Sequence, residues 1–337
     1  MAEKIRLAIL GCGGNSRGHA RRMRARSEDV EIVGVCDIRE DIVNSYLENC
    51  FQDVAEKPEG FTDYDKMLST LKPDAVLIST PHTLHFEHGM KALEAGCHVF
   101  MEKPMVTQVD HAYAIADKVK QTGKIFVVGY NTPCTPAFKY LRDQIRAGTW
   151  GRLEIVTGYI TQGWKRGTQG TWRQNPALSG GGQAYDSGAH LLNSVCWSVE
   201  QKVAETHVFM DNCGTPVDIN STINVRFENG TFAAIAISGN CNARGGSHTA
   251  FVFEDARVEI DGWNGQWIRV FTRDGEIEVP LEEGGPKTPD DNFINAILGR
   301  EEPRTTPFNG IVHSELMESI YRSAQTGLPA KVAQRVA

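Results

Sequence analysis

The sequence predicts two domains, an α/β domain with a parallel sheet followed by an α+β domain with an open, mainly antiparallel sheet. Three observations lead to this prediction. Up to about residue 130, short apolar runs alternate with stretches of helical periodicity, a pattern typical of βαβ units. A glycine-rich turn follows the first apolar run. Beyond the prolines of "NTPCTP" (131–136), strand-like runs follow one another, and two helices close the chain.

Length and composition agree with this organisation. A chain of 337 residues and 37.2 kDa is long for one domain, so we expect a nucleotide-binding domain over 1–130 and a substrate-binding and oligomerisation domain over 131–337.

A net charge of −7 disfavours nucleic acid and anionic membrane surfaces as partners. No apolar run approaches the roughly 20 residues of a membrane span. No signal peptide is evident at the start, so we expect a cytoplasmic protein. The eight cysteines show no C-x-x-C spacing, which predicts buried free thiols.

The elements of the first domain follow in order along the chain. The apolar runs expected to form parallel strands are Ile5–Gly11, Val30–Asp37, Ala75–Ser79, His98–Met101 and Ile125–Gly129. The stretches of helical periodicity between them lie near Gly18–Arg26, Ile42–Cys50, Leu84–Ala95 and Val109–Thr122.

The second domain opens with a helix over Ala137–Ala147 and the strand "RLEIVTGYI". The runs Ile223–Phe227 and Phe232–Ser238 are joined by Asn229-Gly230, a strong hairpin signal. Further strands with turns follow in "TAFVFEDARVEIDGW" and "QWIRVFTRDGEIEVPL", and closing helices are expected near Asp291–Leu298 and Gly310–Thr326.

The glycine-rich turn predicts a dinucleotide site of the Rossmann type. Gly11, Gly13 and Gly14 follow the first strand and precede a helix, so that a pyrophosphate can approach backbone N–H groups at the helix N-terminus. In the strict G-x-G-x-x-G spacing the third glycine would stand at Ser16, a residue small enough for close helix–strand packing, and Gly18 follows two residues later.

A carboxylate at the end of the second strand points to the choice of cofactor. Asp37 is placed to accept hydrogen bonds from an adenosine ribose, and it would repel a 2′-phosphate. We therefore expect NAD rather than NADP. Arg17 and Arg39 lie close enough in the sequence to act as phosphate binders instead, which keeps NADP open as the alternative.

Two further segments carry side chains suited to proton transfer. "CHVFMEKP" ends a predicted strand with Glu102-Lys103-Pro104, and the carboxyl ends of parallel strands are where open α/β sheets bind ligands. In "TWRQNPALSGGGQAYDSGAH", Asp186 and His190 are spaced i, i+4 and would share one face of a helix. Singly, each of these residues is explained as a solvated charge; together, after a dinucleotide turn, they indicate an active site.

The glycine turn, the EKP segment and the D-x-G-x-H segment together resemble the Gfo/Idh/MocA family (glucose–fructose oxidoreductase, inositol dehydrogenase and rhizopine catabolism proteins). The resemblance implies an NAD(P)-dependent dehydrogenase acting on a secondary alcohol of a sugar or polyol, such as a pyranose, an inositol or a glycoside. Some members keep NAD bound and use it twice, so a glycosidase-like enzyme without net redox change is the alternative. A regulatory protein with a dead site is disfavoured because all three reacting residues are present. The family also implies a homodimer or homotetramer that pairs the second domain's sheets.

The resemblance assigns roles to particular residues. Lys103, Asp186 and His190 match the family's catalytic set; we favour His190 as the base, with Lys103 orienting the alcohol oxygen. The cofactor contacts that we expect are Gly11, Gly13, Gly14, Asn15, Ser16, Asp37, Ile38, Thr80, Pro81, His85, Glu102 and Lys103. The substrate contacts that we expect are Lys103, Trp164, Arg166, Trp172, Arg173, Tyr185, Asp186 and His190, with Gln183 as a further candidate.

Two other sequence patterns could be mistaken for a phosphate loop and a metal site. "SGGG" (179–182) follows no strand and precedes no Lys-Ser/Thr pair, so we interpret it as a flexible substrate-side loop rather than a phosphate loop. His82, His85 and His88 are spaced i, i+3, i+6, so on a helix the outer two rings diverge, and we expect no metal there.

Overall fold

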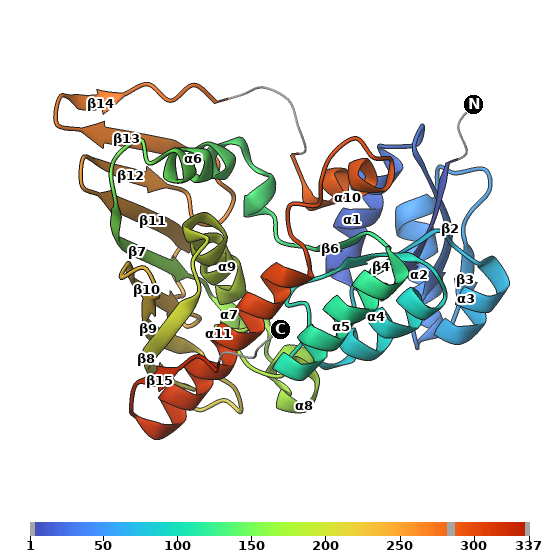
Figure 1. Ribbon diagram of the computed structural model, residues 1–337. Helices are drawn as coiled ribbons and strands as arrows, with labels where there is room; N and C mark the ends of the chain where they lie inside the picture. Colours follow the sequence, from blue (N-terminus) through green and yellow to red (C-terminus); the bar gives the residue numbers. More distant parts are fainter. Residues whose placement is uncertain (1–3, 282–286, 334–337) are drawn as a thin grey trace. The chain divides into compact units, whose positions relative to one another are not determined.

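The computed structural model describes residues 4–281 and 287–333 (Figure 1). The chain forms two compact units. The first contains the residues up to Val106, Asp110–Gly129 and Thr288–Phe308; the second contains Thr107–Val109, Tyr130–Lys287 and the residues from Asn309 onward. The roles expected for residues 1–130 and 131–337 stay predictions. In the structure, Thr288–Phe308 belongs to the first unit although it lies late in the sequence.

A six-stranded sheet in the order β3-β2-β1-β4-β5-β6 forms the centre of the first unit, and all of its neighbouring strands are parallel. β1 and β4 are neighbours at the point where the strand order reverses, which is where open α/β sheets bind ligands. The strands are β1 Ile5–Leu10, β2 Val30–Cys36, β3 Glu59–Phe61, β4 Ala75–Ile78, β5 His98–Met101 and β6 Phe126–Val128. The predicted Rossmann-type α/β class is confirmed.

Helices surround this sheet. Their bounds are α1 Gly14–Arg24, α2 Glu40–Phe51, α3 Tyr64–Leu71, the 3₁₀ turn η1 His82–Leu84, α4 His85–Glu94, α5 Val109–Thr122 and α10 Pro289–Ile297. The central strand β4 is buried over its full length because helices cover both faces of a parallel sheet. β3 and α3 are elements that the sequence interpretation did not identify.

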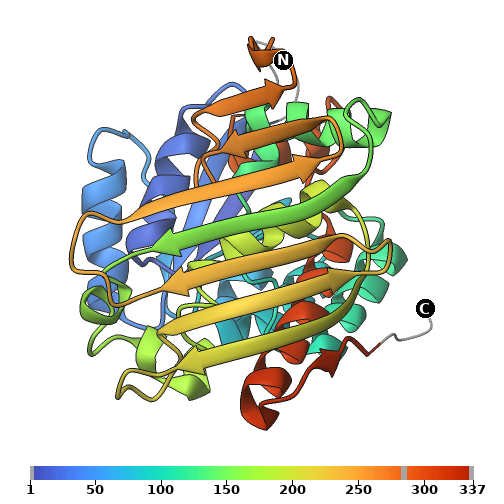
Figure 2. The same ribbon diagram turned by 90° about the vertical axis from the view of Figure 1, so that its left-hand side faces the viewer.

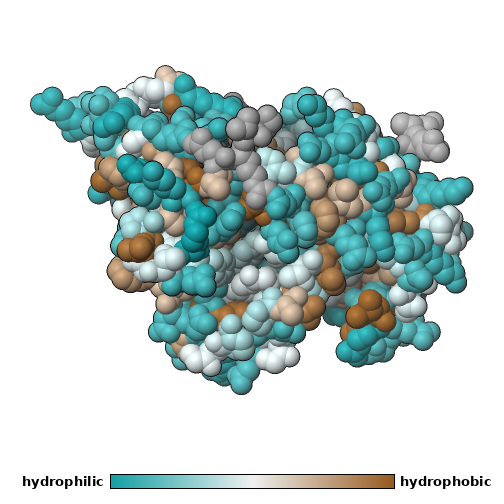
Figure 3. Space-filling model, turned by 60° about the horizontal axis from the view of Figure 1, so that its bottom comes forward, coloured by the Kyte–Doolittle hydropathy of each residue, from teal (hydrophilic) through white to brown (hydrophobic). Residues whose placement is uncertain are grey.

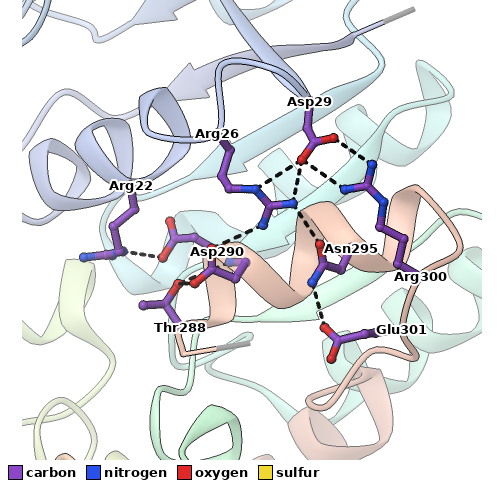
Figure 4. Close-up of polar contacts among 9 residues, drawn as sticks. Arg22, Arg26, Asp29, Thr288, Asp290, Asn295, Arg300 and Glu301 are labelled. Carbon is purple, nitrogen blue, oxygen red and sulfur yellow. Dashed lines mark hydrogen bonds and ion pairs between the residues drawn. The ribbon is translucent and has the colours of Figure 1, made fainter. Parts of the chain in front are cut away.

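A polar network joins α10 to α1 and the turn after it (Figure 4). The Arg26 guanidinium donates to Asp29 Oδ2 at 2.6 Å and to Asn295 Oδ1 at 2.9 Å. Arg300 donates to both oxygens of Asp29, at 2.9 and 3.1 Å. Arg22 Nε donates to the buried Asp290 at 2.6 Å. These contacts bind a late segment of the chain to the nucleotide-binding fold.

The second unit is built on a nine-stranded sheet in the order β14-β13-β12-β11-β7-β10-β9-β8-β15. Its pairs are antiparallel except β10 and β7, which are parallel, so the predicted open and mainly antiparallel sheet is confirmed. The strands are β7 Leu153–Thr161, β8 Val203–Asp211, β9 Asn220–Phe227, β10 Phe232–Ser238, β11 Gly246–Phe253, β12 Ala256–Ile260, β13 Ile268–Thr272, β14 Gly275–Ile277 and β15 Ala330–Lys331.

In the part of the chain that the structure describes, the helices of this unit lie on one side of the sheet (Figure 2). They are η2 Thr132–Cys134, α6 Pro136–Ala147, α7 Trp164–Gly167, η3 Trp172–Gln174, α8 Pro176–Ser179, α9 Gly188–Val199 and α11 Pro307–Thr326. Among the residues that the structure describes, no helix crosses the face of the sheet turned to the viewer in Figure 2. In β10, Ala233, Ile235 and Ile237 point into the core, and the alternate residues are exposed.

None of the described helices is long and apolar enough to cross a membrane. Hydrophilic residues cover most of the face drawn in Figure 3, with hydrophobic ones in small groups. The eight cysteines are all free thiols.

Candidate functional site

The glycine turn lies at the switch point of the first sheet. Gly11 follows β1 with φ +92°, and an added Cβ would lie 2.4 Å from the carbonyl oxygen of Ser79 at the end of β4, so only glycine fits there. An added Cβ at Gly13 or Gly14 would meet nothing within 4 Å, which leaves this side of the turn open. α1 begins at Gly14, and the positive end of its dipole lies at this open turn.

Ser16 fills the place of the third glycine as predicted. It is fully buried, its hydroxyl donates to Gly13 O at 2.9 Å, and its carbonyl accepts from the Tyr46 hydroxyl at 2.8 Å. The small, buried serine side chain is compatible with close packing of α1. Asn15, one residue earlier, is exposed.

Asp37 ends β2 and faces the turn. Its Oδ2 accepts from the backbone N–H of Cys12 at 3.0 Å, and its Oδ1 accepts from the backbone N–H of Arg39 at 3.2 Å. The Arg39 guanidinium is turned to Asp41, with Nε donating to Oδ1 at 3.0 Å. The neighbouring Ile38 is 90% exposed, unusual for so large an apolar side chain.

The EKP segment follows β5 at the same edge of the sheet. The Glu102 N–H donates to Ile78 O at 2.9 Å, and its Oε2 accepts from the Lys103 N–H at 3.1 Å. An added Cβ at Gly129 would lie 3.1 Å from Glu102 Oε1, so the glycine after β6 leaves room for this carboxylate. The Lys103–Pro104 peptide bond is cis.

Thr80 and His85 hold the end of β4 against this segment. The fully buried His85 ring lies with Nε2 2.9 Å from Thr80 O and Nδ1 2.8 Å from Pro104 O, and burial lowers its pKa. His88 Nδ1 lies 3.0 Å from Thr80 Oγ1. His85 thus braces two strand ends. Pro81, between these residues, is half-buried. Among the described residues no group of three His, Cys, Asp or Glu side chains could hold a metal ion.

A buried histidine that we did not predict connects α1, the EKP segment and α10. His19 Nε2 lies 2.6 Å from Glu102 Oε1, and Nδ1 lies 2.7 Å from Asp290 Oδ1. Burial by itself lowers the pKa of His19, but the carboxylates of Asp290 and Glu102 outweigh it and raise the pKa to about 9. His19 is therefore a buried imidazolium that holds Glu102 in place.

In the second unit, the structure places Asp186 just before a helix rather than on one. α9 begins at Gly188, and Asp186 lies in the preceding turns, so the expected shared helix face with His190 is wrong. Asp186 is 5% exposed, and its Oδ2 accepts from Trp164 Nε1 at 2.8 Å and from Arg173 Nε at 3.0 Å. The Asp186 carboxylate is thus held by an ion pair and by an indole N–H.

His190 lies in the first turn of α9. Its Nδ1 is 2.9 Å from Asn131 Oδ1, and its ring packs against that of Trp263, with centroids 4.6 Å apart. The Tyr130 ring meets it edge-on at 6.1 Å. One ring nitrogen is thus held by an amide, the arrangement by which a catalytic imidazole is oriented. Lys103, the third predicted catalytic residue, belongs to the first unit.

The other residues expected to contact the substrate differ in how deeply they are buried. Tyr185 is 3% exposed and stacks on Tyr321, so it belongs to the core. Trp172 and Arg173 are half-buried, and the Arg173 guanidinium lies 4.5 Å from the centre of the Trp172 ring. Arg166 is exposed on α7.

A buried carboxylate anchors the glycine-rich loop that leads to Asp186. Asp218 is 3% exposed and accepts from the N–H groups of Gly182 at 2.6 Å and Ala184 at 2.8 Å, and from the Tyr321 hydroxyl at 2.6 Å. An added Cβ at Gly182 would lie 1.9 Å from Asp218 O. The glycines therefore permit a close backbone approach, and the loop is built into the unit. Gln183 in the same loop is fully buried.

The sequence interpretation missed several residues of these networks, among them His19, Asp290, Asn131, Trp263 and Asp218. A signal existed for Asn131, because it follows the apolar run "FVVGY" near the carboxyl end of a parallel strand. Nothing in the sequence alone paired His19 with Asp290, which lies 271 positions away.

Comparisons with known proteins show the family and the fold. A family model described as an oxidoreductase family with an NAD-binding Rossmann fold matches residues 5–130, and a GFO/IDH/MocA C-terminal domain model matches residues 138–268. The chain is 26% identical to the D-glucoside 3-dehydrogenase of Escherichia coli (strain K12), over 97% of both chains.

Two further similarities were found. The chain is 29% identical to glycosyl hydrolase family 109 protein 2 of Akkermansia muciniphila, over 50% of this chain and only 38% of that protein. The crystal structure of the WlbA dehydrogenase from Bordetella pertussis, in complex with NADH and UDP-GlcNAcA, superposes with a TM-score of 0.84 at 22% identity, covering 99% of this chain and all of that one. The structural similarity shows a shared fold.

Proposed function

The chain belongs to the Gfo/Idh/MocA family of oxidoreductases, and from this premise we propose that it is an NAD-dependent enzyme that moves hydride between a secondary alcohol of a sugar or polyol and nicotinamide. The observation that carries the proposal is the histidine at the start of α9, His190, held through one ring nitrogen by Asn131. The similarity to a D-glucoside 3-dehydrogenase over 97% of both chains supports a glycoside or a related pyranose as the substrate class.

The residues of the first unit fit a dinucleotide. The open turn at Gly13 and Gly14 leads into the N-terminus of α1, which suits a pyrophosphate. Asp37 suits an adenosine ribose, and the exposed Ile38 offers an apolar surface for the adenine. Because Arg39 is engaged by Asp41, these residues favour NAD over NADP. When bound, NAD supplies the hydride acceptor.

The protein's own side chains supply the proton transfer. His190 takes the hydroxyl proton as hydride leaves the same carbon, and Lys103 orients and polarises the alcohol oxygen. Asp186, which forms an ion pair with Arg173, accepts a hydrogen bond from a substrate hydroxyl. His19 holds the Glu102 carboxylate, which in turn receives the Lys103 N–H.

A second candidate function rests on the similarity to the family 109 glycosyl hydrolase. In that case the same residues would act twice, with NAD reduced and reoxidised in one cycle, and the net reaction would be hydrolysis. The match spans less than half of that protein's length, so we rank this function second.

A substrate panel tests both functions. Purified protein is incubated with NAD and methyl glucosides, free hexoses or inositols, and reduced nicotinamide is followed by absorbance. Aryl glycosides in the same panel report hydrolysis. We expect net reduction of NAD with at least one glycoside; sugar release without net reduction would support the second function instead.

Substitutions test the catalytic roles proposed for Lys103 and His190. Lys103→Ala and His190→Ala should each lower kcat by about 10²–10⁴-fold, the usual contribution of a proton-transfer group, and leave NAD affinity within a few-fold. Lys66→Ala, at an exposed position on α3, is the control. Retention of more than about a tenth of the wild-type rate in both variants would exclude the assigned roles.

A further inference from the structure

We propose that Asn131 is a positioning residue for His190: its side-chain amide links the ring to the backbone carbonyl of Trp263, places the ring proton on Nδ1 and makes Nε2 the atom that receives the substrate proton. The first part of this proposal, the tautomer, follows from the structure alone. The second part, the role of Nε2, rests on the proposed function of His190.

The direction of the hydrogen bonds determines the tautomer. Asn131 Nδ2 lies 2.8 Å from Trp263 O, and a carbonyl oxygen can only accept, so the amide must present its NH₂ group there. The amide oxygen then faces His190 Nδ1 at 2.9 Å. Because this oxygen also only accepts, Nδ1 must carry the hydrogen, and in the neutral ring the lone pair is on Nε2.

The far end of this chain of hydrogen bonds is rigidly built. The Asp261 carboxylate, 9% exposed, accepts from the N–H groups of Trp263 at 3.1 Å, Asn264 at 3.2 Å and Gln266 at 3.2 Å. Gly265 in the same loop has φ +59°, and an added Cβ would lie 2.4 Å from a threonine hydroxyl. The Trp263 carbonyl is thus held where the Asn131 amide needs it.

The near end is held to the same helix that carries His190. The Ser194 hydroxyl donates to His190 O at 2.7 Å, and it lies 2.6 Å from the fully buried hydroxyl of Thr132. Since the Ser194 proton is used on His190, Thr132 is the donor to Ser194. The backbone turn that carries Asn131 is therefore tied to the first turns of α9, and amide and imidazole keep a constant separation.

A neutral amide has a chemical consequence that a carboxylate would not have. An aspartate in this place would attract a proton to the ring and stabilise the imidazolium. The amide orients the ring without adding charge, so it does not favour the protonated ring as a carboxylate would. When the ring is protonated, Nδ1–H still donates to the same oxygen, and no rearrangement is needed during turnover.

The test reads the tautomer directly. The protein is labelled with ¹⁵N-histidine, the ring nitrogen shifts are recorded in the NAD-free protein, and His190→Gln identifies the His190 signals among those of the ten histidines. We expect the proton on Nδ1 in the wild type and in Asn131→Asp, which can still accept from the ring. In Asn131→Ala we expect the proton to move to Nε2. Asn212→Ala, in an exposed turn of the same unit, should leave the ring unchanged.

Kinetics on the substrate found by the panel form the second arm. Asn131→Ala should lower kcat at least about tenfold, less than the roughly 10²–10⁴-fold that the proton-transfer group itself contributes, with the KM for NAD unchanged. Asn131→Asp should move the acid limb of the kcat–pH profile to higher pH because the carboxylate stabilises the protonated ring.

The experiments distinguish failure of the predicted tautomer from failure of the proposed role of His190. A proton on Nε2 in the wild type overturns the proposal without any variant being needed, and so does an unchanged tautomer in Asn131→Ala. If Asn131→Ala does not fold, the wild-type tautomer and the pH profile of Asn131→Asp decide the matter, and an unmoved acid limb counts against the proposal. A shifted tautomer with full turnover would support the hydrogen-bond chain and overturn the role of His190 as the proton acceptor.

Discussion

We predict that the choice between NAD and NADP depends on Asp37. We predict that the wild type binds NAD more tightly than NADP, and that Asp37→Ser weakens NAD binding by about 10–100-fold, the value of one or two hydrogen bonds to a charged group. The change also removes the acceptor of the Cys12 N–H. Calorimetry with both cofactors measures the effect, with Asp53→Ser, an exposed ion-paired aspartate, as the control. Equal or tighter binding of NADP by the wild type would contradict this and shift attention to Arg17 and Arg39.

His19 makes stability depend on pH in the alkaline range. Its pKa is raised from the ordinary 6.5 to about 9 in the folded protein, so the folded state holds a proton that the unfolded chain releases. The stabilisation, on the order of 3 kcal/mol, is complete below about pH 6.5 and is lost as the pH rises through about 9. The groups that face His19 are Asp290, Glu102 and Arg22.

Thermal melts between pH 6 and 10 measure this effect. We expect the Tm of the wild type to fall across that range more steeply than that of His19→Gln, which has no titrating ring. His111→Gln, on the surface helix α5, is the matched control and should keep the wild-type slope. Parallel curves for the wild type and His19→Gln would show that the buried imidazolium is not formed.

At the scale of single residues, the sequence supported those assignments that local spacing carries. Gly11, Asp37, Lys103 and His190 stand in short motifs whose chemistry is readable without a structure. His19 and Asn131 act through partners distant in the chain, so their meaning depends on tertiary contacts that spacing does not encode.

Among the elements, the loop that precedes α9 is the one most constrained by its backbone. Gly182→Ala would place a methyl group 1.9 Å from Asp218 O, and we expect a loss of about 1–3 kcal/mol in the free energy of unfolding together with reduced turnover. Gly167→Ala, whose added methyl meets nothing within 4 Å, should leave the Tm unchanged or slightly higher. Equal Tm values for the two variants would show that the loop is not fixed by Asp218.

Some of the helices and strands could be predicted from the sequence, and others could not. The strands β1, β4 and β5 are largely apolar because both faces of the sheet are buried. The "ENG" before β10 predicted a hairpin that the structure confirms, with Gly230 at φ +91°. β3 has only three residues in a polar stretch and is held by pairing with β2. Two features could not be predicted from local sequence: β10 pairs in parallel with β7, and α10 packs against α1. Both depend on contacts between residues that are far apart in the chain.

For the whole molecule, the open face of the nine-stranded sheet predicts assembly. Ile155, Tyr159, Phe209 and Phe232 are 43–68% exposed, and the strands around them carry alternating small and apolar side chains. Such a face is buried by a partner in stable proteins, and we propose a second copy of this chain, giving a homodimer or homotetramer.

Light scattering tests this assembly. We expect a mass of at least twice 37.2 kDa at micromolar concentration, and a monomer when Ala234→Arg places a charge between β7 and β9. Ala55→Arg, an exposed position outside the sheet, is the matched control. A wild-type monomer would defeat the prediction.

The placement of Thr288–Phe308 in the first unit has a consequence for the order in which the protein matures during translation. The nucleotide-binding unit is nearly complete in sequence by Gly129, yet Asp290, which neutralises the buried His19, is made more than 150 residues later. A nascent chain released from the ribosome at residue 130 would carry a buried imidazole with one of its two carboxylates missing. We therefore expect the first unit to mature only after most of the second has been synthesised, so that both units of the protein reach their final form together near the end of translation.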